Sequence, residues 1–140
     1  VYIEFPEGTD ISKTNTFING EWAWVNIDIA NTYTEQFGRK QQGGFIDIVQ
    51  PIIKKPMFGF DKAVLNAAVR FEYVDWNKGT FTSTGNTIAD HIIAVAPAIS
   101  WRPAGQTVLR LNYRYNWQTD LLGNPPSRLA GFQFGFSSYF

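Results

Sequence analysis

The sequence predicts an all-β fold, an antiparallel up-and-down transmembrane β-barrel region. Several segments alternate apolar and polar side chains with a period of two, which in an extended strand puts the two kinds on opposite faces. Aromatic residues make up 16% of the 140 residues, charged residues only 17%, and the formal net charge is zero. No stretch approaches the about 20 consecutive apolar residues of a transmembrane helix, so any membrane span must consist of strands. An aromatic-rich soluble β-sandwich is the rival prediction.

Seven strands are expected, in the order 1–6, 21–33, 43–55, 63–76, 92–102, 107–118 and 129–140. The polar stretch 7–19 is predicted to be a connection, and Pro51 predicts a bulge because it cannot donate a ladder hydrogen bond. Residues 1–140 form a single predicted β-barrel region. Bacterial barrels close with an even number of strands. We therefore expect missing N-terminal sequence, or a partner chain that supplies the remaining strands.

The clearest alternation lies at 107–118, and strands 63–76 and 92–102 separate their two rows almost as well. In strand 21–33, the apolar row is predicted to contain Ala23, Val25, Ile27 and Ile29. Trp22 and Trp24 then share the polar row, either inside a lumen or beyond the apolar band. The phase of strand 43–55 stays open, because Ile52 and Ile53 are adjacent.

The polar rows carry the candidate functional residues. In a barrel, charged side chains on these rows line the lumen and set its ion preference. Arginines there favour anions, but neighbouring carboxylates would cancel part of that field, so we expect a weak anion preference at most. Alternatively, these residues are solvated on the outer face of a soluble sheet, or they form cross-strand ion pairs that lock adjacent strands together. The predicted pore-lining set is Asp28, Arg70, Glu72, Arg110, Asn112, Arg114 and Asn116.

The final stretch, LAGFQFGFSSYF, places Phe132, Phe134, Phe136 and Phe140 in one row. It resembles the C-terminal signature strand of Gram-negative outer-membrane β-barrels. The resemblance implies a location in the bacterial outer membrane, contact with outer-membrane lipid, and recognition of this phenylalanine row by the barrel-assembly machinery. It also implies that the C-terminus lies on the periplasmic side.

Two further segments, RFEYVDWN and SWRPAGQTVLRLNYRY, are similar to the C-terminal hairpins of phosphate-selective-type porins. This resemblance implies a large antiparallel barrel with a water-filled lumen. Because the polar rows are continuous and carry arginine, we expect a porin-like channel for passive diffusion of small hydrophilic solutes, and hence ion transport. The alternative is a structural or accessory barrel that supports partner membrane proteins. Assembly as a homo-oligomer is compatible with both.

Other chemistries have little support in the sequence. Cysteine is absent and His91 is the only histidine, so neither a metal site nor a cofactor is expected. No serine stands in a nucleophile motif matched to this histidine, so we do not expect an enzyme. The balanced charge argues against a nucleic-acid partner.

Overall fold

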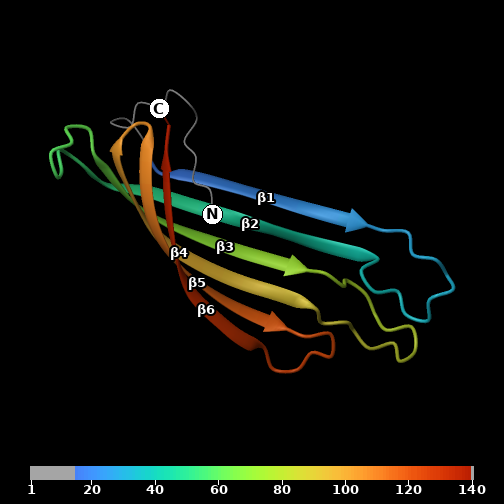
Figure 1. Cartoon of the computed structure of the whole chain (residues 1–140). Helices are drawn as coiled ribbons and strands as arrows, with labels where there is room; N and C mark the ends of the chain where they lie inside the picture. Colours follow the sequence, from blue (N-terminus) through green and yellow to red (C-terminus); the bar gives the residue numbers. More distant parts are fainter. Residues whose placement is uncertain (1–14, 140) are drawn as a thin grey trace.

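The computed structural model describes residues 15–139, which form one open six-stranded antiparallel sheet (Figure 1). Each strand pairs with the next along the chain, so the topology is an up-and-down meander. The strands are β1 (Phe17–Asn26), β2 (Lys40–Lys54), β3 (Val64–Asp75), β4 (His91–Ala104), β5 (Thr107–Thr119) and β6 (Ser127–Ser138). The strand predicted at 1–6 and the terminal Phe140 lie outside the described residues.

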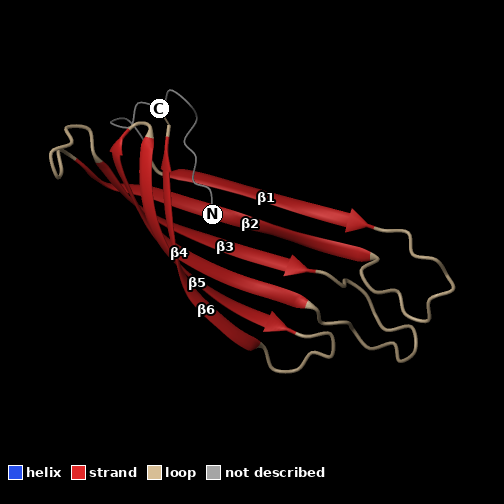
Figure 2. Cartoon of the chain, viewed as in Figure 1, coloured by secondary structure: helices blue, strands red, loops and turns tan. Residues whose placement is uncertain are grey.

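Figure 1 shows a twisted, curved sheet whose two ends differ. The long loops 27–39, 76–90 and 120–126 extend from one end, and the connections 55–63 and 105–106 lie at the other. Among the described residues 15–139, Figure 2 shows only strands and loops. Within residues 15–139, no helix is long and apolar enough to cross a membrane.

Strands β2 to β6 confirm the predicted positions, whereas the bounds of the first described strand differ. β1 begins at Phe17, inside the predicted connection 7–19, and it ends at Asn26 rather than at residue 33. Pairing explains the shift, since Phe17 and Ile18 lie opposite Val49 and Ile48 of β2. Tertiary pairing has here overridden the polar local composition.

Both irregularities in the ladder lie next to a proline. The β2–β3 register shifts between Pro51 and Ile53, which confirms the bulge that the sequence predicts. The β4–β5 register shifts between Trp101 and Ala104, around Pro103. A proline leaves one ladder hydrogen bond unmade, which favours a bulge at that point. Pro97 of β4 shows that the bulge is not obligatory, because it pairs with Val69 in unbroken register.

The two faces of the sheet have opposite chemistry, and their burial is the reverse of a soluble core. The polar face contains buried residues such as Asp47, Asn66, Ala96, Ser100 and Asn112. On the opposite, apolar face, large side chains are exposed, among them Ile46, Phe71, Ile99, Leu111, Phe132, Phe134 and Phe136. In the described part of the chain, no second layer covers this apolar face.

The phase predicted for the first described strand is wrong. Trp22 pairs with Gly44, and its ring stacks on Tyr73 of β3 with the ring centroids 6.0 Å apart and an interplanar angle of 8°. Both tryptophans therefore lie on the apolar face, and Ala23 lies on the polar face. Gly44 permits this arrangement, because a Cβ on it would lie 2.6 Å from the Trp22 ring. The stacking of Trp22 on Tyr73 across Gly44 accounts for which face of the sheet each β1 side chain occupies.

Candidate functional site

An ion-pair network on the polar face begins with Asp47 of β2 and Arg70 of β3, which lie directly opposite each other. Arg70 Nε donates to Asp47 Oδ1 at 2.6 Å, and Arg70 Nη2 donates to Oδ2 at 2.5 Å. This is a bidentate pair, the strongest geometry for arginine and a carboxylate. The guanidinium also lies 4.1 Å from the centroid of the Phe45 ring, a cation–π arrangement. Arg70 is therefore fixed from two sides.

The network continues through Glu72 across the middle of the sheet. Arg70 Nη1 lies 3.6 Å from Glu72 Oε1, and Arg114 Nη2 of β5 lies 2.5 Å from Glu72 Oε2. Because β4 lies between β3 and β5, this last contact passes over a whole strand. The small side chains of Ala94 and Ala96, which pair with Glu72 and Arg70, lie beneath it and are only 1% and 2% exposed. Because these alanines are small, the side chains of Glu72 and Arg114 can meet above β4; this ion pair is called the Glu72–Arg114 bridge below.

Other polar residues extend this face toward β6. Asn112 Nδ2 donates to Gln133 Oε1 at 2.7 Å, and Arg114 Nε donates to Asn116 Oδ1 at 2.9 Å. Arg110 lies over Gly135, where a Cβ would be only 2.9 Å from its Nε atom. The absence of a side chain at Gly135 therefore accommodates the arginine. Together these contacts make a continuous polar surface from β2 to β6.

The structure brings most of the predicted pore-lining residues onto this one face. Arg70, Glu72, Arg110, Asn112, Arg114 and Asn116 share it. Asp28 does not, because it lies two residues beyond the end of β1, exposed in the loop 27–39. The carboxylate that joins the arginines instead is Asp47, which sequence reasoning missed. The available signal was a charged residue within the apolar run FIDIV.

The predicted assembly residues lie on the other face. Phe132, Phe134 and Phe136 of β6 point away from the polar network and are 75%, 72% and 64% exposed. Phe140 lies outside the described residues. The three described phenylalanines therefore form an apolar row along the edge strand β6.

The charges within the network balance. Two carboxylates face two guanidinium groups, and the Asp47 side chain is only 5% exposed while that of Arg114 is 31% exposed. The pair between Asp47 and Arg70 is therefore the least hydrated part, and Arg114 is the most accessible to solvent. The field of the network is therefore largely cancelled at longer range, because opposite charges only a few ångströms apart act as dipoles.

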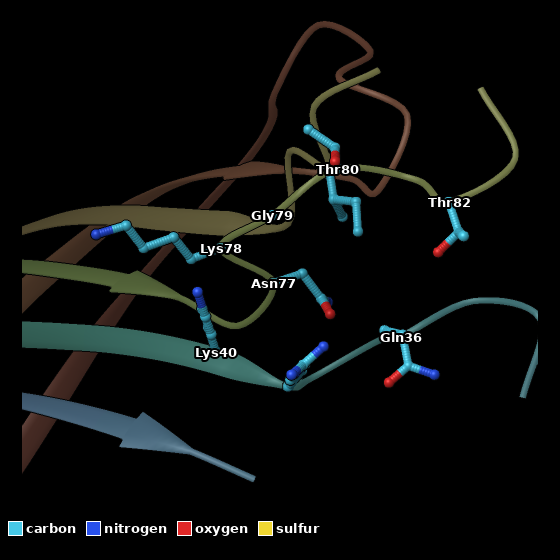
Figure 3. Close-up of a pocket in the computed structure, with 9 residues that line it drawn as sticks. Gln36, Lys40, Asn77, Lys78, Gly79, Thr80 and Thr82 are labelled. Atoms are coloured by element: carbon cyan, nitrogen blue, oxygen red, sulfur yellow. The ribbon is translucent and has the colours of Figure 1, made fainter. Parts of the chain in front are cut away.

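A second polar site lies among the long loops, where a pocket of about 210 Å³ opens between the loop 27–39 and the loop 76–90 (Figure 3). Asn77 holds the two loops together at the pocket. Its Oδ1 accepts a hydrogen bond from the Gly38 amide at 2.5 Å, and its Nδ2 donates to Asp90 at 2.6 Å. Lys78 points along the sheet and donates to Gln42 at 3.1 Å. The pocket is lined by Gln36, Arg39, Lys40, Asn77, Lys78, Gly79, Thr80, Thr82 and Ile88.

Glu35 ties the same two loops together. Its carboxylate accepts hydrogen bonds from the Thr82 amide at 2.7 Å, the Ser83 amide at 3.2 Å and the Ser83 hydroxyl at 2.5 Å. These bonds, with that of the Ser83 hydroxyl foremost, favour the charged form and lower the pKa of Glu35 below its ordinary value. The loop end of the sheet is thus held by a carboxylate that titrates in acid.

No metal centre emerges in residues 15–139, where no group of three or more histidine, cysteine, aspartate or glutamate residues is placed to hold an ion. Comparisons with protein-family models, with curated proteins and with solved structures found no match.

Proposed function

We propose that the chain forms part of an outer-membrane β-barrel, with its apolar face toward lipid. The observation that carries the proposal is the inverted burial of the sheet, with ion pairs covered and phenylalanines exposed. Water would penalise such an apolar surface, whereas hydrocarbon would not. The polar face would then line the lumen.

Aromatic residues at both ends of the apolar face support the same proposal. Trp101 marks one end, opposite Leu109 of β5, and Trp117 of β5 marks the other, where its ring meets that of Tyr115 at 4.5 Å. The eight-residue step from Leu109 to Trp117 spans about 27 Å along the strand. With a strand tilt of about 40°, the span across a membrane is about 21 Å, close to the about 25 Å apolar band between aromatic girdles.

Within this barrel, the function that the polar face supports best is a porin-like channel for passive diffusion of small hydrophilic solutes. The six-stranded sheet would be one arc of the wall, and further antiparallel strands would pair with the edges of β1 and β6. The continuous polar surface from β2 to β6 is the feature that a water-filled lumen needs. Because Asp47 and Glu72 neutralise Arg70 and Arg114, the expected anion preference is weak.

Electrical recording in a planar bilayer tests the channel and its selectivity together. Replacing Arg110 and Arg114 with Ser leaves Glu72 without its partner from β5, so the reversal potential in a salt gradient should shift toward cations. Arg128→Ser is the matched control, since Arg128 is exposed at the loop end of β6 and should leave the potential unchanged. An unchanged potential in the double variant would contradict the pore-lining assignment.

A structural or accessory barrel that supports partner membrane proteins is the second candidate. The ion-pair network favours it, because the network joins β2, β3 and β5 and leaves no arginine of the network without a carboxylate. A protein that inserts into the bilayer and stays electrically silent would support this candidate and contradict the channel.

A further inference from the structure

The connection between β2 and β3 contains a tight turn with an unusual residue. Met57 and Phe60 exchange two backbone hydrogen bonds, both 3.1 Å long, around Phe58 and Gly59. Phe58 has φ = 52° and Gly59 has φ = 84°. Two-residue turns with positive φ at both positions strongly prefer Asn-Gly, and a bulky side chain in this region is strained. In the described residues, Phe58 is the only non-glycine residue with positive φ.

Burial inside the protein does not account for this strained phenylalanine, since its side chain is 82% exposed. The Phe58 and Phe60 rings each meet Trp101 edge-on, with centroids 5.7 Å apart and interplanar angles of 88° and 79°. Trp101 lies on the apolar face at the end of β4. The three rings therefore extend that face past the ends of the strands, and strain retained in an exposed residue points to a binding role.

The charges around this cluster differ from those at the loop end. The segments 54–62 and 101–107, which combine the turns at this end with the strand ends beside them, carry four basic side chains and one acidic side chain, Asp61. The basic ones are Lys54, Lys55, Lys62 and Arg102. At the opposite end, the segments 27–40, 75–91 and 120–128 hold four basic and five acidic side chains. The turn end is thus basic and aromatic, which matches the surface of an anionic phospholipid leaflet.

We propose that the turn at 57–60 is an interfacial anchor that inserts Phe58 into the headgroup region of an anionic phospholipid leaflet. Lys55 and Lys62 would then lie at the level of the lipid phosphates. This inference depends on the proposed membrane location. It adds that the turn end binds anionic phospholipid headgroups. Aromatic rings and lysines flanking an apolar surface are the groups that partition to this depth.

Site-specific labelling tests the depth of insertion directly. The chain contains no cysteine, so Phe58→Cys can carry a single environment-sensitive fluorophore. Leu122→Cys is the matched control, because Leu122 is equally apolar and 77% exposed but lies in the loop 120–126 at the other end. The full chain is reconstituted into vesicles of phosphatidylglycerol and phosphatidylcholine with brominated acyl chains. The label at position 58 should shift to shorter wavelength and be quenched, while that at 122 stays in water.

A second variant separates anchoring from folding. Phe58→Asn creates the preferred Asn-Gly turn, so the hairpin should remain intact, while a fluorophore at Lys62→Cys should be quenched less by the brominated lipid than it is with Phe58 present. Replacing Lys55 and Lys62 with Gln should lower the quenching of the label at position 58 in vesicles that contain phosphatidylglycerol and leave it unchanged in pure phosphatidylcholine. Wild-type protein that associates with no vesicle would overturn the membrane proposal as well. Vesicle-inserted protein with position 58 in water, or with unaltered quenching at position 62 in Phe58→Asn, would overturn the anchor alone.

Discussion

Replacing Arg70 with Met should destabilise the protein far more than replacing its partner Asp47 with Asn. The substitution keeps an apolar side chain against Phe45 but removes both hydrogen bonds to Asp47, whose side chain is 5% exposed. A buried charge that loses its partner costs about 3–5 kcal/mol. Asp47→Asn leaves Arg70 beside Glu72 and should cost about 1–3 kcal/mol.

The double variant tests whether the pair itself carries this energy. With both charges removed, no buried ion is left unpaired, so the double variant should recover at least half of the loss caused by Arg70→Met. The free energy of unfolding is measured in urea by tryptophan fluorescence, with every variant in the same lipid. Arg128→Met should change it by less than about 0.5 kcal/mol. A double variant as unstable as Arg70→Met alone would refute the ion-pair explanation.

Three other substitutions probe the fold and its loops. Ala96→Leu should destabilise the protein by about 1–3 kcal/mol in urea unfolding, because the added atoms occupy the space beneath the Glu72–Arg114 bridge; a neutral effect would contradict that packing. Gly44→Val should abolish the ring stacking of Trp22, measured as a changed near-ultraviolet circular dichroism spectrum, and an unaltered spectrum would refute the predicted clash. The pKa of Glu35 is lowered, so its loop contact contributes stability above the unfolded value of 4.5 and loses it as pH falls through the lowered pKa. In the wild type, protection of the Thr82 amide against hydrogen exchange should fall over that acidic range, and in Glu35→Gln this pH dependence should be lost. Equal pH profiles in the two proteins would contradict the role of Glu35 in holding the two loops together.

Strand positions and most of their faces were predictable from the sequence, because period-two alternation is a local property. Leu109, Leu111 and Tyr113 lie on the apolar face, and Arg110 and Asn112 lie on the polar face, as that pattern predicts. The bulge at Pro51 was also predictable, since a missing N–H is visible in the sequence.

The phase of β1 and the connections within the network were not predictable, because both depend on which residues face each other across strands. The alternation of Ala23 and Val25 suggested an apolar row, but the stacking of Trp22 on Tyr73 reverses it. The Glu72–Arg114 bridge joins residues 42 positions apart over a strand of small side chains. The alternation within one strand does not show which side chains meet across an intervening strand.

In the proposed barrel, the exposed apolar face of the sheet contacts lipid and the polar face contacts water. Spin labels at single cysteines along β5, from residue 108 to residue 113, test it most directly once the full chain is reconstituted into lipid vesicles. Collision rates with lipid-soluble oxygen should peak at 109, 111 and 113, and those with a water-soluble nickel chelate should peak at 108, 110 and 112. Equal rates at odd and even positions, or the opposite phase, would contradict this orientation of the sheet.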